Sequence, residues 1–296
     1  MQTLTDLFKR ATEGARACVS VAVAQDVSVL KAAEEAYSRG IADFLLVGDE
    51  AAIRAAAAEK KIDLSPFPIL HEPDPALASR EAVRLVAEGR ATALMKGLVD
   101  TSVLMKAALD REMGMRTGRK LSHVAVFSLS TYHKLLFVTD AAINIAPDFE
   151  TKKDIIQNAV EALRNLGIER PKAALLAAKE KVDEKMPLTL EWEKLSQMNQ
   201  SGEISGCVLD GPLALDNAVS AEACAAKGIS SEVGGDADIL VCPDIEAGNI
   251  LYKSLAFLAG GKNGGVVVGA KRPIILTSRA DNSESKLISI ALGVLF

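Results

Sequence analysis

Short aliphatic runs alternate along the chain with alanine-rich stretches that have helical periodicity. The first apolar run, CVSVAVA, covers residues 18–24, and apolar positions then recur on one helix face from Val29 to Tyr37 before Gly40. A buried strand followed by an amphipathic helix that ends at a glycine is the repeating unit of helix-covered parallel sheets. We therefore predict an α/β fold.

The same alternation continues to the end of the chain. Further strands are predicted at residues 43–49, 66–70, 92–97, 122–129, 134–140, 172–178, 207–211, 237–244, 266–270 and 272–278. Helices are predicted at residues 28–40, 51–62, 76–88, 100–114, 151–166, 188–199, 251–260 and 283–294, with a short helix after residue 211. The strands at 122–129 and 134–140 are too close for a helical crossover, so we predict an antiparallel hairpin there.

Two interruptions of the pattern divide the chain into domains. The hairpin ends near Asp140 and Pro147 follows it, and a second interruption lies near Gly269. We predict that residues 1–143 form domain I, which is completed by residues 270–296, and that residues 144–269 form an inserted domain II.

Length, composition and charge limit the classes of protein to which this chain can belong. The 296 residues suffice for about two domains, and 49% hydrophobic against 25% charged residues is the balance of a globular protein. The net charge is -5 and the chain has no basic block, which argues against a nucleic-acid partner. A few local arginines or lysines can still hold an anionic substrate.

Cysteine and histidine usage argues against a metal site or a disulfide framework. The chain has four cysteines without a CxxC spacing and three histidines. Three of the thiols lie in apolar runs and are predicted to be buried and inert: Cys18, Cys207 and Cys242. No signal peptide and no run of eighteen apolar residues is present, so we expect a cytoplasmic protein without a membrane partner.

Polar residues that follow predicted strands are the candidates for chemistry, because ligands of open α/β sheets bind at the carboxyl ends of strands. After the strand at 92–97, Lys96 and Gly97 precede Thr101 and Ser102, whose hydroxyls and backbone N–H groups at a helix start can hold a phosphate. Helix capping by Asp100 or Thr101 explains this turn equally well.

The last predicted strand delivers Ser278 and Arg279 into a polar turn. An arginine beside a hydroxyl can fix and polarise a phosphoryl group, because the guanidinium is always charged and donates in a fork. A surface salt bridge is the structural alternative.

Two further turns carry acidic and amide side chains. Asp210 precedes the pair Gly211-Pro212, which we interpret as a turn. Asp244, Gly248 and Asn249 lie between the strand at 237–244 and the next helix, where a structural role and a ligand-binding role are both open. The four turns together predict a substrate site.

Several common motifs are absent from the sequence. Neither GxGxxG after a strand nor GxxxxGK[ST] occurs, and the glycines of residues 260–265 have neither spacing. No GxSxG nucleophile elbow occurs. The sequence therefore argues against a dinucleotide-binding protein, a P-loop nucleotide-binding protein and a serine hydrolase.

In this order, the segments KGLVDTS, DGPLALDNAVS, PDIEAGNILYK and TSRADNSESKLISIAL resemble the phosphate acetyltransferase and phosphate butyryltransferase family, and DGPLALDNA with TSRAD is closer to the butyryl branch. The resemblance implies two parallel-sheet α/β domains with a cleft between them, similar to isocitrate and isopropylmalate dehydrogenases. It implies reversible conversion of acyl-CoA and phosphate to acyl phosphate and CoA. It also implies no metal, no cofactor besides the CoA thioester and phosphate substrates, and a homo-oligomer, a dimer or higher.

By this resemblance, Ser278 and Arg279 match the pair that contacts the reacting groups, and Thr101 and Ser102 match a hydroxyl pair of the acetyl enzymes. Lys96, Gly97, Asp210, Asp244, Gly248 and Asn249 complete the expected substrate site. The chain departs from the acetyl enzymes at two positions: Ser285 stands where they have aspartate, and Phe257 where they have arginine.

The thiol of CoA must lose a proton before it attacks an acyl phosphate. Asp281, Glu284 and Asp244 are the candidate bases, and we assign Asp281 to the catalytic group with Ser278 and Arg279. We expect a ternary-complex mechanism. The alternatives are a phosphate acetyltransferase, a nicotinamide-dependent dehydrogenase of the same fold, and a non-catalytic protein that binds CoA or acyl phosphates.

Overall fold

The computed structural model describes residues 1–277 and 281–296, and its contacts group the chain into two compact units. Unit 1 comprises Met1–Thr3 and Lys120–Asn263, and unit 2 comprises Leu4–Arg119 and Gly264–Phe296. The chain therefore passes through unit 2 twice. The divisions lie after residues 119 and 263, whereas the sequence pattern placed them after residues 143 and 269, because the predicted hairpin pairs within unit 1.

Unit 2 contains a mainly parallel sheet in the order β3-β2-β1-β4-β11-β10. Its strands are β1 (Ala17–Ala22), β2 (Ala42–Gly48), β3 (Ile69–His71), β4 (Ala93–Lys96), β10 (Lys262–Val268) and β11 (Ile274–Ile275). The pair β10 and β11 is antiparallel, which the parallel-sheet prediction missed. The segment between these two strands, residues 269–273, is too short to form the crossover that a parallel pair needs.

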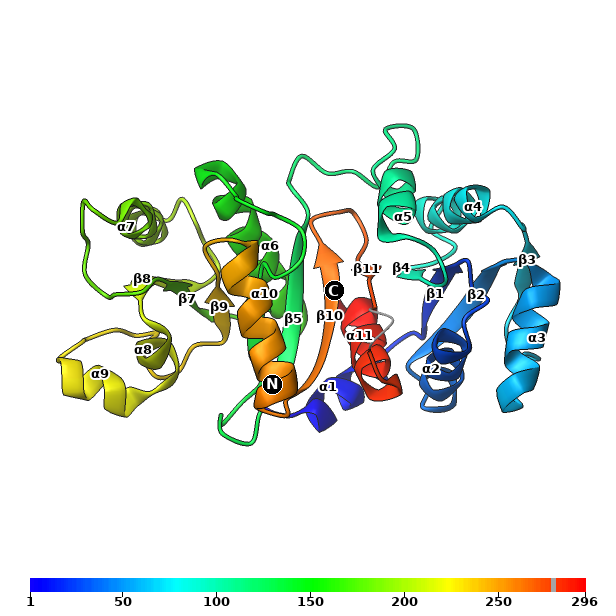
Figure 1. The fold of residues 1–296 in the computed structure, drawn as a ribbon, viewed down its shortest axis with the longest axis horizontal. Coiled ribbons are helices and arrows are strands. Elements are labelled where there is room, and N and C mark those ends of the chain that lie inside the picture. Colours follow the sequence, from blue (N-terminus) through cyan, green and yellow to red (C-terminus); the bar gives the residue numbers. More distant parts are fainter. Residues whose placement is uncertain (278–280) are drawn as a thin grey trace. The chain divides into compact units, whose positions relative to one another are not determined.

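Helices cover both faces of this sheet. The helices are α1 (Leu4–Ala11), α2 (Val27–Ser38), α3 (Glu50–Lys60), α4 (Pro75–Ala87), α5 (Thr101–Ala108) and α11 (Ser283–Leu295). Within unit 2, α4 and α5 lie on one face, and α2 and α11 on the other (Figure 1). The last helix, α11, also packs against α1. Residues from both chain segments thus form one core.

Unit 1 contains a second α/β sheet, in the order β5-β6-β9-β7-β8. Its strands are β5 (Ser122–Ser128), β6 (Leu136–Thr139), β7 (Lys172–Leu176), β8 (Val208–Leu213) and β9 (Ile239–Val241). The predicted antiparallel hairpin of β5 and β6 is confirmed, and the remaining pairs are parallel.

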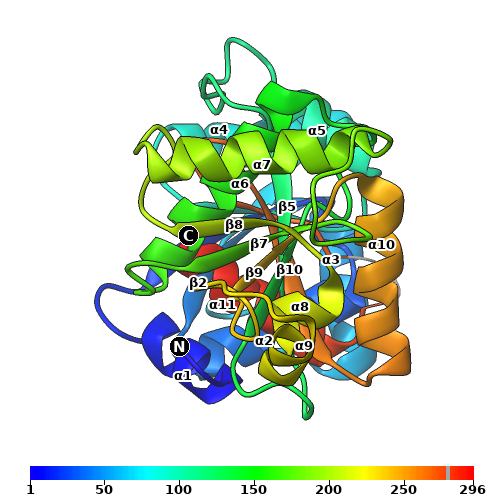
Figure 2. The same cartoon turned by 90° about the vertical axis from the view of Figure 1, so that its left-hand side faces the viewer.

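The helices of unit 1 are α6 (Phe149–Asn165), α7 (Pro187–Gln200), α8 (Leu215–Val219), α9 (Ala221–Lys227) and α10 (Ile245–Lys253), which continues as the π-helix η1 (Ser254–Leu258). Figure 2 shows α6 and α7 on one side of the strands of this unit and α8 and α9 on the other. Within residues 1–277 and 281–296, no helix is both long enough and apolar enough to cross a membrane.

Two element boundaries differ from the sequence prediction. Strand β8 continues through Gly211 to Leu213, where a turn was expected, because Gly211 has no side chain to meet Leu175 of the neighbouring strand. Helix α10 begins at Ile245 rather than at residue 251, because Asp244 caps it and accepts a hydrogen bond from Ala247 N.

Candidate active site

A small hollow lies beside the carboxyl end of β4 in unit 2. Its volume is about 10 Å³, room for one water molecule. It is lined by Asp26, Ser28, Val29, Lys96, Gly97, Leu98, Thr277 and Lys286. These residues come from the ends of β1, β4 and β11 and from the starts of α2 and α11, so the hollow lies where an open α/β sheet binds ligands.

The predicted site residues Lys96 and Gly97 line this hollow. The Lys96 side chain is buried, and its Nζ donates to the carbonyl oxygens of Gly97 and Val99 at 3.2 Å each. A Cβ on Gly97 would lie 2.2 Å from Val23 O, so only glycine lets the two strand ends approach this closely. Val23 itself has φ +56°, a strained conformation for a β-branched residue and one that clusters at functional sites.

Lys286 and Asp26 are lining residues that the sequence analysis did not single out. Lys286 is 1% exposed, and its Nζ donates to Asp281 O at 2.7 Å. Asp26 caps α2, and its Oδ1 accepts from the backbone N–H groups of Ser28 and Val29. Burial would raise the pKa of Asp26, but a hydrogen bond from the Ser28 hydroxyl, the two backbone hydrogen bonds and the charge of Lys286 together hold it below its ordinary value. The sequence signal that could have identified Lys286 is its position beside the apolar residues of the last predicted helix.

The hydroxyl pair Thr101 and Ser102 lies exposed at the start of α5. Asp100 occupies the N-cap position, but its side chain makes no capping hydrogen bond. The Asp100 side chain therefore does not cap α5, and the backbone N–H groups at the start of this helix donate no hydrogen bond to its carboxylate.

Of the expected catalytic residues, Ser278 and Arg279 lie outside the described residues. Asp281 is half-buried and accepts from Lys286 through its backbone carbonyl. Ser285, which stands where the acetyl enzymes have aspartate, is buried in the first turn of α11 and donates its N–H to Asn282 Oδ1.

A second group of predicted site residues lies in unit 1, after the adjacent parallel strands β6 and β9. Asp140 is buried directly after β6, and Gly248 packs against it so closely that a Cβ would lie 2.2 Å from Asp140 O. Asn249 Nδ2 donates to Ala141 O at 3.2 Å. The structure thus brings the turn around Asp244 to the carboxyl end of β6, although Asp244 itself caps α10.

Asp140 is the main organiser of this region, and the sequence analysis missed it. Its carboxylate accepts from the N–H groups of Ala142, Ile143 and Asn144 and from Asn144 Nδ2. Asn144 Nδ2 also donates to Leu121 O. A buried carboxylate with four donors fixes the loop after β6.

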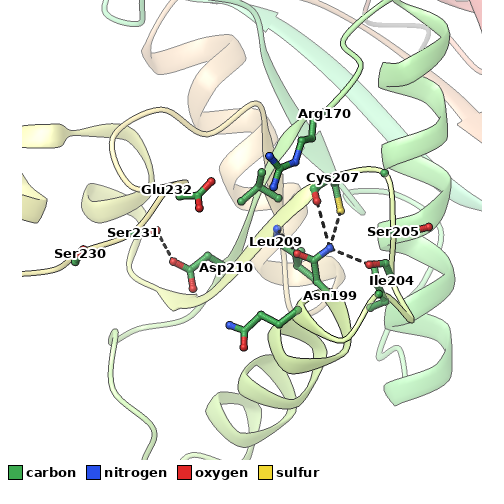
Figure 3. A pocket seen from close by; sticks show the side chains of 14 residues that line it. Arg170, Asn199, Ile204, Ser205, Cys207, Leu209, Asp210, Ser230, Ser231 and Glu232 are labelled. Carbon is green, nitrogen blue, oxygen red and sulfur yellow. Dashed lines mark hydrogen bonds between the residues drawn. The ribbon is translucent and has the colours of Figure 1, made fainter.

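Asp210 does not lie at a strand end, because β8 continues past it to Leu213. It lies within β8, paired in register with Ala174, and faces a different hollow of about 570 Å³ in unit 1. Figure 3 shows its carboxylate beside Ser231, whose hydroxyl donates to it. Because Arg170 and Cys207 precede β7 and β8, this hollow opens toward the amino ends of these strands.

The four cysteines are free thiols, and none is activated. Burial raises the pKa of Cys207 to about 11 and that of Cys242 to about 12. Burial also raises the pKa values of Cys18 and Cys224. Inert thiols were predicted for three of them, and Cys207 and Cys242 are buried as expected, while Cys18 is half-buried.

No cluster of three or more His, Cys, Asp or Glu side chains suited to a metal ion occurs in the described ranges 1–277 and 281–296. Phe257, the second departure from the acetyl enzymes, is 70% exposed on η1, with Lys253 Nζ 5.7 Å from its ring centre. It fills no described cavity.

Comparisons with known proteins agree with one another. The family model described as "Phosphate acetyl/butaryl transferase" matches residues 2–76 and 75–294. The chain is 48% identical to the phosphate butyryltransferase of Clostridium acetobutylicum, over 94% of this chain and 92% of the relative. It is 46% identical to that of Clostridium beijerinckii, over 98% and 96%. The phosphate acetyltransferase of Rhizobium meliloti is 44% identical, over 98% and 92%.

Solved structures show the same fold. A branched-chain phosphotransacylase from Enterococcus faecalis superimposes with a TM-score of 0.84 at 36% identity, covering 94% of this chain and 98% of that one. A 4-hydroxythreonine-4-phosphate dehydrogenase from Klebsiella pneumoniae has a TM-score of 0.61 at 15% identity, over 95% and 100%. At that identity the second likeness concerns the fold alone.

Proposed function

Because the chain belongs to the family of phosphate acetyl and butyryl transferases, we propose that it is an acyltransferase that converts butyryl-CoA and phosphate to butyryl phosphate and CoA, reversibly. The observation that carries the butyryl assignment is the 46–48% identity to two phosphate butyryltransferases over nearly the whole chain. The acetyl enzyme is the less favoured alternative, at 44% identity.

The reaction we propose joins both substrates in one complex. A phosphate oxygen attacks the thioester carbonyl, the C–S bond breaks, and CoA leaves as a thiolate that then takes a proton; the reverse reaction runs the same steps backward. No acyl-enzyme is needed once the substrates are positioned. The raised pKa values of all four cysteines support this, because thiols at neutral pH are poor nucleophiles. Ping-pong kinetics would contradict the ternary complex.

The test is the release of free CoA thiol from acetyl-, butyryl- and longer acyl-CoA, with and without phosphate, corrected for the four cysteines of the chain. We expect release that depends on phosphate and is fastest with butyryl-CoA. A faster reaction with acetyl-CoA would assign the acetyl activity instead. Thermal stabilisation by CoA without any release would indicate the non-catalytic binding protein.

Arg279 is proposed to neutralise the phosphoryl group, and Ser278 to hydrogen-bond the developing charge, as their match to the family motif implies. We expect Arg279→Ala to raise the KM for phosphate about tenfold or more, because charge-assisted hydrogen bonds are lost. The KM for acyl-CoA should stay within about twofold. Steady-state kinetics with both substrates varied measures this, and Arg272→Ala, at an exposed arginine nearby in sequence, is the matched control. An unchanged phosphate dependence would contradict the role of Arg279.

Three expectations of the sequence analysis stay predictions: a cleft between two domains, a homo-oligomer and a cytoplasmic location. Asp281 as a catalytic group and the hydroxyl pair Thr101 and Ser102 as substrate ligands belong with them. Thr101 and Ser102 lie exposed at the start of α5, and this position supports their proposed role as substrate ligands. We likewise propose that the reaction needs no cofactor and uses only the CoA thioester and phosphate as substrates.

A further inference from the structure

The outer face of α10 and η1 in unit 1 exposes a group of large hydrophobic side chains. Ile145 is 69% exposed, Ile250 66%, Phe257 70% and Leu258 85%, the four highest values among large hydrophobic residues in the described part of the chain. The last three lie on the helix itself, and Ile245 N at its start donates to Ile145 O at 3.1 Å. Single exposed hydrophobic residues are ordinary, but a group like this one marks an interaction surface.

The helix has an inner and an outer face. The inner face packs against the core of unit 1 through Leu251 and Leu255. Positions that are four, three and four residues apart share one side of a helix. The exposed residues with this spacing are Glu246, Ile250, Lys253 and Phe257. The outer face therefore presents a carboxylate, an ammonium group and apolar side chains in a fixed order.

We propose that the outer face of α10 and η1 binds the same face of a second copy of this chain, so that the protein is a dimer. The two helices run antiparallel about a two-fold axis beside Ile250, because a symmetric dimer uses one self-complementary patch twice. The residues of this dimer face are Ile145, Glu246, Ile250, Lys253, Phe257 and Leu258. The inference does not depend on the proposed acyl transfer, and it gives the expected homo-oligomer a surface and a size.

The order of residues along the dimer face fits an antiparallel pair. Ile250 packs against Ile250 of the second copy at the axis. Glu246 lies four residues before Ile250 and Lys253 three residues after it, so each Glu246 faces Lys253 of the other copy. Phe257 reaches the start of the other α10, where Ile145 lies. In a parallel pair, like charges would face each other instead, which is unfavourable.

Both charges of the dimer face are available for this pairing. Neither Glu246 nor Lys253 forms an ion pair within the described part of the chain. Lys253 Nζ lies 5.2 Å and 5.7 Å from the ring centres of Tyr252 and Phe257. A glutamate in the first turn and a lysine in the last turn also suit an isolated helix, because they complement its dipole. An exchange of the two charges separates these explanations.

Charge reversal tests the pairing, with the Kd of the dimer measured by sedimentation equilibrium at low salt. Glu246→Lys and Lys253→Glu should each raise this Kd at least about tenfold, because two like-charge pairs replace two attractive ones. The double variant Glu246→Lys/Lys253→Glu should return to within about threefold of the unmodified protein, because opposite charges face each other again. If the charges served only the helix dipole, the double variant would depart furthest from the unmodified protein.

Ile250→Asp tests the apolar centre of the dimer face. Two carboxylates would meet at the axis, so this variant should sediment as a monomer at concentrations where the unmodified protein is a dimer. Leu190→Asp is the matched control, because Leu190 is a 41% exposed leucine of α7 in the same unit and lies outside the dimer face. The control should remain a dimer. Circular dichroism and Tm check that each variant is folded, and if Ile250→Asp does not fold, the charge-reversal variants decide.

Three results would overturn the assignment. A monomeric unmodified protein would leave this face to a different partner. A dimer whose Kd none of these variants changes would have its interface elsewhere on the chain. A double variant as weak as the two single variants would exclude the antiparallel pairing of Glu246 with Lys253.

Discussion

Gly97→Ala should lower the free energy of unfolding by roughly 3 kcal/mol, the upper end of the range for overpacking. The added Cβ would lie 2.2 Å from Val23 O and 2.7 Å from Ala22 O, and both are backbone atoms that cannot rotate away. The hydrogen bonds from Gly97 N to Ala22 O and from Leu98 N to Val23 O hold the same two strand ends together. Relief of the clash therefore has to separate β1 from the end of β4.

Urea denaturation of the purified variant measures this loss, with the midpoint and slope both recorded. Gly118→Ala is the matched control, because nothing lies within 4 Å of a Cβ at that position. We expect the control to be neutral or slightly stabilised, by less than about 1 kcal/mol. A Gly97→Ala protein as stable as the control would show that the two strand ends separate at little cost. Activity should fall in Gly97→Ala even at low temperature, because Lys96 is displaced with its neighbour.

Asp140→Ala should cost about 3 kcal/mol of stability as well, for a different reason. Three backbone N–H groups, those of Ala142, Ile143 and Asn144, would lose their acceptor, and Asn144 Nδ2 would lose its 2.6 Å hydrogen bond to the carboxylate and keep only the one to Leu121 O. Because Asp140 is buried, water cannot replace these bonds without opening the loop. The loop also carries Ala141 O, the acceptor of Asn249, so the candidate site in unit 1 loosens with it.

The control for this prediction is Asp140→Asn, which keeps one carbonyl oxygen of the same shape. We expect it to lose less stability than Asp140→Ala, since part of the acceptor set survives. Thermal and urea unfolding of both variants give the comparison. Equal stability of Asp140→Ala and the unmodified protein would mean that the loop finds other acceptors, and the organising role of Asp140 would be wrong.

The fold was predictable where its signals are local. The alternation of apolar runs and helical periodicity located most strands and helices, and the short link between β5 and β6 gave their antiparallel pairing. The failures depend on tertiary contacts. Gly211 and Pro212 look like a turn in sequence, but β8 continues through them because the Gly211 backbone fits against Leu175. Gly248 looks like a loop residue, yet it lies within α10 because it packs against Asp140.

The candidate site was predictable only in part, for a similar reason. The rule that ligands bind at the carboxyl ends of strands finds Lys96 at the end of β4, and it finds Asn249 in the first turns of α10 after β9. Asp26 and Lys286 are 260 positions apart, and only the order β1-β4-β11 of the sheet brings them to one hollow. A single sequence carries no signal of that neighbourhood beyond the unusual lysine in an apolar helix.

The division of unit 2 into two chain segments also governs how the protein is made. A ribosome releases Leu4–Arg119 first, then the whole of Lys120–Asn263, and only afterwards Gly264–Phe296 with β10, β11 and α11. During that interval the nascent chain exposes the edge of β4 and the apolar surface of α2 that α11 later covers. We therefore expect Lys120–Asn263 to fold before unit 2 is complete, and Leu4–Arg119 to be the more aggregation-prone segment until Gly264–Phe296 has been synthesised.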